Sequence, residues 1–129
     1  MRIEHVAIWT RDIEKLNMFY SKYFGGVAGE KYINSKKSFE SYFIKFDSGA
    51  RLELMQMPTI LVSLNDKNKE YMGFIHIAIS VGSKEKVDSI TKELSESGYT
   101  LVSEPRYTGD GYYESCILDP DGNRVEITV

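Results

Sequence analysis

Arg51-Leu52-Glu53-Leu54 and Arg124-Val125-Glu126-Ile127 are two versions of one short pattern, a glutamate between apolar residues with an arginine in front. A second pair of stretches matches in the same way: Glu4-His5-Val6-Ala7-Ile8 and Ile75-His76-Ile77-Ala78-Ile79. The two glutamates are 73 residues apart and the two histidines 71, so the spacing is nearly constant across half the chain. Such an offset indicates that one supersecondary unit occurs twice.

The repeat divides the chain into two modules of one domain. We expect a single domain over residues 1–129, made of module 1 (1–57), a connector (58–72) and module 2 (73–129). The connector is polar, contains Pro58, and is expected to hold at most a short helical turn. Both modules should carry the same order of helices and strands, because they derive from one unit.

The sequence pattern of each module predicts a strand, a helix and three further strands. The expected helix 13–24 has Asp12 as its N-cap and glycines 25 and 26 as its end, and the expected helix 84–97 has Ser83 and Gly98 in the same roles. The expected strands are 2–9, 28–33, 39–47 and 50–56 in module 1, and 74–81, 99–103, 112–118 and 123–128 in module 2. The sequence therefore predicts an α+β fold of two βαβββ modules.

Composition excludes several classes of protein. Hydrophobic residues make up 42 % and charged residues 27 %, which is ordinary for a globular domain. The net charge of −3 gives no electrostatic basis for nucleic-acid binding, and no apolar run approaches the roughly 20 residues that cross a bilayer. The N-terminus lacks the apolar stretch of a signal peptide, and the only cysteine, Cys116, has no partner for an internal disulfide. We expect a cytoplasmic protein in which Cys116 is a small buried apolar residue.

Strand periodicity places the two histidines and two glutamates on corresponding faces. Side chains alternate between the two faces of a strand. In the last strand, Val125 and Ile127 should face the helix, so Glu126 faces away. The same alternation directs the other three of these residues away from the helices. If each module curls into a half-barrel, that surface is the concave one.

The alternative explanation is that these histidines and glutamates only stabilise the fold and bind no ion. A histidine on a strand is often only hydrogen-bonded, and an arginine beside a glutamate can form a surface ion pair that contributes about 0–1 kcal/mol. Against this, histidine occurs only twice in the chain, both times at corresponding points of the repeat. We therefore predict one divalent metal ion bound by His5, Glu53, His76 and Glu126. Imidazole nitrogen and carboxylate oxygen suit Zn or Ni best, with Co, Mn and Fe as alternatives, and leave positions open for catalysis.

The chain resembles the vicinal-oxygen-chelate superfamily, which includes glyoxalase I, fosfomycin-resistance proteins, bleomycin-binding proteins and extradiol dioxygenases. The resemblance covers the whole chain, and Asp119-Pro120-Asp121-Gly122-Asn123-Arg124-Val125-Glu126 is its most specific motif. It implies half-barrels that pair into an eight-stranded open barrel, within one chain or between subunits, and we expect a homodimer with two sites. The set of two histidines and two glutamates resembles that of glyoxalase I (lactoylglutathione lyase). One departure is Trp9, which stands where glyoxalase I usually has an arginine that binds glutathione.

The resemblance implies a metal-dependent lyase or isomerase that acts on a 2-oxoaldehyde–thiol adduct by proton transfer through an enediolate. It favours Glu126 as the base, with Glu53 as the other candidate. Trp9, Arg106, Tyr112 and Tyr113 are candidate substrate-binding residues, although a loop cation and strand aromatics are often only solvated or packed. Two alternatives stay open: a thiol transferase or hydrolase like the fosfomycin-resistance proteins, and a non-catalytic module that binds a small molecule.

Overall fold

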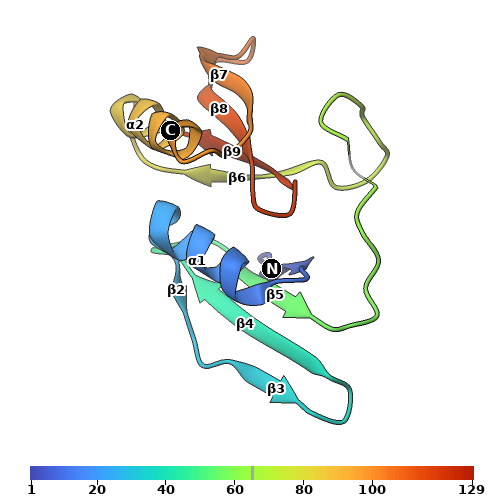
Figure 1. Ribbon diagram of the computed structural model, residues 1–129. Helices are drawn as coiled ribbons and strands as arrows, with labels where there is room; N and C mark the ends of the chain where they lie inside the picture. Colours follow the sequence, from blue (N-terminus) through green and yellow to red (C-terminus); the bar gives the residue numbers. More distant parts are fainter. Residues whose placement is uncertain (65) are drawn as a thin grey trace. The chain divides into compact units, whose positions relative to one another are not determined.

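The computed structural model describes residues 1–64 and 66–129 (Figure 1). The chain forms two compact units, Met1–Ser63 and Leu64–Val129. The expected connector 58–72 includes residue 65, which lies outside the described residues. The rest of the connector holds turns and bends, so the short helical turn expected there is not found in the described part. No helix among the described residues is long and apolar enough to cross a membrane.

Unit 1 is a five-stranded sheet with one helix. Its elements in chain order are β1 (His5–Trp9), α1 (Ile13–Phe24), β2 (Val27–Ala28), β3 (Tyr32–Asn34), β4 (Phe39–Lys45) and β5 (Arg51–Gln56). The strands follow the order β1-β5-β4-β2, with β3 also paired to β4. The first strand runs parallel to β5, and the remaining pairs are antiparallel. The parallel pair results from the helix that carries the chain back across the sheet.

The helix α1 begins and ends where its local signals predict. The carboxylate of Asp12 accepts a hydrogen bond from the backbone N–H of Lys15, and Gly25 adopts a left-handed conformation with φ +68°. The buried stripe of the helix packs on β4 and β5. The core of unit 1 consists of these fully or nearly fully buried residues: Ile13, Leu16, Phe19, Tyr20, Ile44, Leu52 and Leu54.

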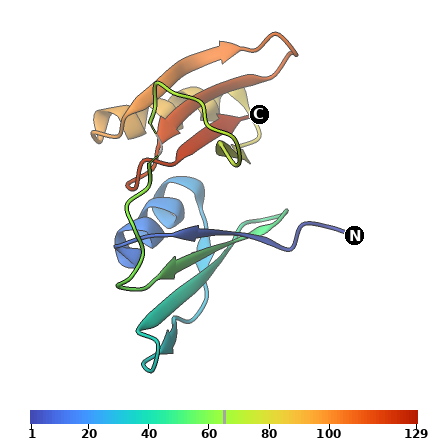
Figure 2. The ribbon, with the colours of Figure 1, turned by 90° about the vertical axis from the view of Figure 1, so that its right-hand side faces the viewer.

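Unit 2 repeats the pattern with a four-stranded sheet. Its elements are β6 (His76–Ser80), α2 (Lys84–Glu96), β7 (Leu101–Tyr107), β8 (Tyr113–Leu118) and β9 (Arg124–Thr128). The strand order is β6-β9-β8-β7, with β6 parallel to β9 and the other two pairs antiparallel. The two longest strands of this sheet, β7 and β8, lie side by side and are drawn in shades of orange in Figure 2. The α+β class with two βαβββ units is confirmed, and the pairing of the units into a barrel remains a prediction.

Two strand predictions are corrected. The expected strand 28–33 is two short strands, because residues 29–31 leave the ladder between β2 and β3. The expected strand 99–103 lies instead at Leu101–Tyr107 and continues through Pro105. This strand forms the edge of its sheet, where a proline does not interrupt a hydrogen bond to a further strand. The register between β7 and β8 shifts on both sides of Ser103, as expected of an edge strand with irregular pairing.

Candidate metal centre

Each unit brings one histidine and one glutamate together. In unit 1, Nε2 of His5 lies 3.7 Å from Oε2 of Glu53. In unit 2, Nε2 of His76 lies 3.1 Å from Oε2 of Glu126. The sequence prediction of matched faces is thus supported within each unit, and the convergence of the two pairs on one ion stays a prediction.

The same register produces both pairs. Glu53 on β5 is directly opposite Ala7 on β1, and Glu126 on β9 is directly opposite Ala78 on β6. Each histidine precedes its alanine by two residues, so it is the diagonal neighbour of the glutamate on the same face. The small alanine side chain leaves room for the imidazole to reach across to the carboxylate. This arrangement explains why the pattern His-x-Ala occurs in both halves.

The imidazoles are more open to solvent than the carboxylates. The side chains of His5 and His76 are 39 % and 38 % exposed, whereas those of Glu53 and Glu126 are 16 % and 20 % exposed. A ligand or ion can therefore reach the ring nitrogens, while the sheet covers most of each carboxylate. Such partly covered oxygen and nitrogen donors are the type that holds a divalent ion with an exchangeable position.

The His5 pair has a supporting network that the sequence did not reveal. Oε2 of Glu4 lies 2.5 Å from Nδ1 of His5, so the other ring nitrogen is left to face Glu53. Nε of Arg51 donates to Oε1 of Glu4 at 2.7 Å, and the Arg51 guanidinium lies 4.1 Å from the centre of the Phe43 ring. That ring meets the His5 imidazole edge to face at 5.4 Å. A carboxylate behind a histidine fixes its tautomer and orientation, as is common at metal sites.

The His76 pair has a different environment. Ile75 occupies the place of Glu4, so no carboxylate precedes this histidine. The matching arginine, Arg124, instead donates two hydrogen bonds to Glu70, at 2.8 and 3.0 Å, and others to the carbonyl oxygens of Lys67 and Lys69. The arginine of unit 2 therefore holds the segment before β6 and does not support its histidine.

Burial raises the pKa of Glu126. Loss of solvent is the largest cause, the charge of Glu114 adds to it, and the nearby His76 and Arg106 oppose it. Directly opposite Glu126 on β8 is Cys116, a buried free thiol. Burial, together with the charge of Glu126, raises the pKa of Cys116 to about 11. The expectation that Cys116 is a small buried residue is confirmed, and it lies on the face that carries Glu126.

The four candidate substrate-binding residues are distributed over both units and differ in which side of the sheet they face. Trp9 is on the His5 face of β1 and 44 % exposed, with its ring edge to face against Phe39 at 6.0 Å. Arg106 pairs with Glu114 at 3.5 Å on the Glu126 face of unit 2. Tyr112 is exposed in the loop before β8. The hydroxyl of Tyr113 donates to Asp88 of α2 at 2.7 Å, so this side chain is directed toward the helix, opposite to Glu126.

The donor chemistry fits a divalent ion, with two donors in each unit. Within residues 1–64 and 66–129 no group of three or more histidine, cysteine, aspartate or glutamate side chains gathers closely enough to hold an ion. An ion with four protein ligands therefore needs one pair from each of two units. Two imidazoles and two carboxylates would match the charge of such an ion.

The chain matches the family model of the Glyoxalase/Bleomycin resistance protein/Dioxygenase superfamily over residues 2–127. It belongs to this superfamily. Among curated relatives, "Uncharacterized protein YqjT" of Bacillus subtilis (strain 168) is 24 % identical over 134 aligned positions, which cover 97 % of this chain and 96 % of the relative.

Solved structures of the superfamily share the fold. A glyoxalase family protein from Enterococcus faecalis superposes with a TM-score of 0.77 at 22 % identity, covering 99 % of this chain and 97 % of the other. The trypanothione-dependent glyoxalase I of Leishmania major has a TM-score of 0.75 at 20 % identity, covering 99 % and 86 %. At these identities the superpositions establish the glyoxalase-type fold.

Proposed function

We propose that this superfamily member is a divalent-metal-dependent lyase or isomerase of the glyoxalase I type, acting on a 2-oxoaldehyde–thiol adduct. The observation that supports this most is the repeated imidazole–carboxylate pair, with Nε2–Oε2 distances of 3.7 and 3.1 Å at the same register in both units. A structural histidine needs no such duplication, whereas a shared ion needs matched donors.

His5, Glu53, His76 and Glu126 are the residues that would hold the ion, which we propose to be Zn or Ni. When bound, a divalent ion supplies a Lewis acid that stabilises negative charge on two adjacent substrate oxygens. We propose that the two contributing units come from one chain or from the two subunits of a homodimer. Dimers are frequent in this superfamily, as the resemblance implies.

Glu126 is proposed as the base. Its carboxylate is mostly covered, and burial raises its pKa, so the ionised form is a stronger proton acceptor than an exposed glutamate. Glu126 would remove the proton from the carbon that carries sulfur and deliver it to the adjacent carbonyl carbon, while the hydroxyl proton on the first carbon moves to the oxygen of that carbonyl. The first carbon then becomes a thioester and the second an alcohol, with no net change in atoms. His76, at 3.1 Å from this carboxylate, keeps it on the substrate face.

Arg106 is proposed to bind an anionic part of the substrate. Its side chain is 53 % exposed, and its pairing with Glu114 at 3.5 Å holds the guanidinium on the same face as Glu126. Because β8 separates β7 from β9, the guanidinium lies two strands away from the base. It therefore suits a group at some distance from the reacting carbons.

The thiol is proposed to differ from glutathione, because Trp9 stands where the resemblance leads us to expect an arginine. The glyoxalase I of Leishmania major, described as trypanothione-dependent, is a case of this fold used with another thiol. The test is to strip the protein of metal, reload it separately with each candidate ion, and offer methylglyoxal with a panel of thiols. We expect thioester formation with at least one thiol, in the metal-loaded protein only. Absence of thioester with every thiol and every ion, in folded protein that retains metal, would contradict the proposal.

A further inference from the structure

Unit 1 contains an open cleft away from the His5–Glu53 pair. It has a volume of about 670 Å³ and lies at the end of the sheet, between the β3–β4 hairpin, the end of β5 and the segment that follows it. Pockets that bind small molecules commonly measure about 300–1,000 Å³ and combine apolar walls with a few polar groups. Here the apolar lining includes Phe39 and Met57, and the polar lining includes Arg11 and Glu40.

An aromatic cluster extends the apolar wall along the sheet. Phe39 contacts Trp9 edge to face at 6.0 Å and lies 6.1 Å from the ring of Tyr32. Trp9 and Tyr32 remain 44 % and 56 % exposed, so this cluster is not a closed core. Trp9 follows His5 by four residues on one strand, so the two side chains share a face at a separation of about 13 Å. A ligand bound at the aromatic cluster can therefore extend toward the His5–Glu53 pair.

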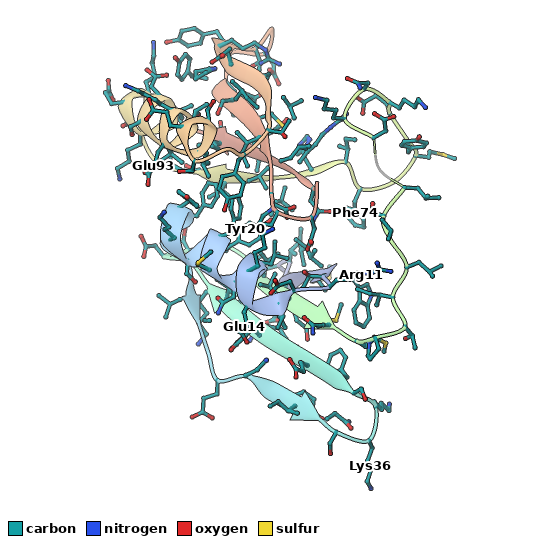
Figure 3. The ribbon with its side chains drawn as sticks, viewed as in Figure 1. Arg11, Glu14, Tyr20, Lys36, Phe74 and Glu93 are labelled. Carbon is teal, nitrogen blue, oxygen red and sulfur yellow. The ribbon has the colours of Figure 1, made fainter. Side chains whose placement is uncertain are left out.

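The cleft contains one cation, Arg11, that can bind an anion. Glu40 pairs with Lys31 at 2.5 Å, an ammonium that it shares with Glu14 at 2.9 Å, so Glu40 has its own partner within unit 1 and does not pair with Arg11. Nη2 of Arg11 donates to the carbonyl oxygen of Ile60 at 3.1 Å, and among the described residues this guanidinium forms no ion pair with a carboxylate. Arg11 lies two residues beyond the end of β1 and is labelled in Figure 3. The cleft thus combines an aromatic wall with one cation whose charge is not matched.

We infer that this cleft binds a small molecule with an apolar, ring-bearing body and one carboxylate or similar anionic group, the ring against Phe39 and Trp9 and the anion at Arg11. The inference rests on the proposed function in one respect: the ligand is assigned as the arm of the thiol substrate that lies far from the reacting carbons. The substrate class is then a thiol with an aromatic or branched acidic arm, in place of the glutamyl arm of glutathione.

The test uses the single tryptophan as a reporter. Because Trp9 is the only tryptophan and contacts a residue that lines the cleft, its fluorescence should change when the cleft fills. The full chain is titrated in the presence of a metal chelator with phenylbutyrate, with the uncharged analogue phenylbutanol, and with acetate, which lacks the ring. We expect a saturable change in fluorescence with phenylbutyrate. The affinity for each analogue should be about tenfold lower, because phenylbutanol lacks one charged hydrogen bond and acetate lacks one ring contact.

Two variants and a control assign the contacts. Arg11→Gln should lower the affinity for phenylbutyrate to the affinity for phenylbutanol. Phe39→Leu should lower the affinity for both ligands, while the circular dichroism spectrum stays unchanged. Lys36→Gln is the matched control, because it removes a cation from the exposed β3–β4 turn without touching the cleft lining, and it should bind like the wild type (Figure 3).

Three results would overturn the inference: no saturable change with phenylbutyrate, equal affinity for the acid and the alcohol, or a Trp9 signal that follows protein concentration and dimer formation without ligand. The last result would mean that a second copy of the chain covers the cleft. Because the titration contains no metal and no turnover, its failure leaves the lyase assay intact. Absence of lyase activity likewise leaves the binding result intact.

Discussion

Oε2 of Glu4 lies 2.5 Å from Nδ1 of His5, although neighbouring residues on a strand normally point to opposite faces. The exception arises because β1 begins at His5, so Glu4 precedes the ladder and its side chain turns back. In unit 2 the corresponding residue is Ile75, which cannot form this contact. The two imidazole–carboxylate pairs therefore have the same strand register, but only His5 has a second carboxylate that orients its ring.

Replacing Glu4 should weaken metal binding. Glu4→Ala removes the carboxylate that orients His5, and we expect divalent-ion affinity to fall about 10- to 100-fold. Calorimetric titration of the metal-free protein measures the affinity, and nitrogen NMR of the imidazole reports whether the His5 tautomer changes. The matched control is Glu70→Ala, which removes the carboxylate partner of the corresponding Arg124 and should leave affinity unchanged. Equal losses in both variants would refute a specific role for Glu4.

The two glutamates should differ in their effects on turnover. Glu126→Gln keeps the shape of the side chain and removes the base, so kcat should fall about 10²- to 10⁴-fold at saturating metal. Glu53→Gln should chiefly raise the metal concentration needed for half-maximal activity, because one oxygen donor is weakened. Steady-state kinetics at several metal concentrations separates the two effects. If Glu53→Gln shows the larger loss of kcat at saturating metal, the assignment of the base is reversed.

Cys116 should be inert in the folded protein. Burial raises the pKa of its thiol from 9.0 to about 11, so at pH 8 almost no thiolate is present and the sulfur is covered. We expect iodoacetamide to modify Cys116 in urea and not under native conditions, as measured by mass spectrometry. Rapid native modification at a rate close to that in urea would show that the thiol is exposed.

The Cys116 thiol should also make the free energy of unfolding depend on pH in the alkaline range. Between pH 9 and 11 the unfolded chain has lost the Cys116 proton while the folded chain retains it, so the free energy of unfolding falls as pH rises through this range. Urea unfolding should show a steeper fall in the wild type than in Cys116→Ala, which lacks the group. Parallel curves for the two proteins would contradict the assigned pKa direction.

Gly26 should be required for packing of α1 on β4. A Cβ at this position would lie 2.5 Å from Cγ2 of Ile44, a fully buried residue, and 3.2 Å from the carbonyl oxygen of Tyr20. Gly26→Ala should lower the free energy of unfolding by about 1–3 kcal/mol in urea denaturation. Gly29→Ala is the control, because its added Cβ would meet nothing closer than 3.7 Å. Unfolding of both variants at the same urea concentration would show that Gly26 is not required for this packing.

Local signals in the sequence were sufficient for the helices. Asp12 and Ser83 cap the two helices as predicted, with side-chain oxygens that accept from the backbone N–H groups of Lys15 and Lys86. The period-two pattern also placed each histidine and glutamate on one face, because that face depends only on alternation along the strand. The predicted glyoxalase-type α+β class follows from these local elements together with the repeat.

Features that depend on pairing between strands were harder to predict. The break between β2 and β3 and the continuation of β7 through Pro105 are set by which strand lies alongside, and the local sequence does not specify this. Glu4 was overlooked for the same reason, since strict alternation directs it away from His5. The cleft at Arg11 involves the hairpin, the end of β5 and the following segment, and their proximity arises only in the folded unit.

Metal content shows whether the two imidazole–carboxylate pairs share one ion. The full chain is reloaded with Zn or Ni, dialysed, and its metal-to-protein ratio is measured by elemental analysis, alongside His5→Ala and His76→Ala. We expect one divalent ion per chain in the wild type and loss of that ion in either variant, because each unit contributes one imidazole. A wild type that retains no ion, or a histidine variant that retains a full equivalent, would refute the shared metal site.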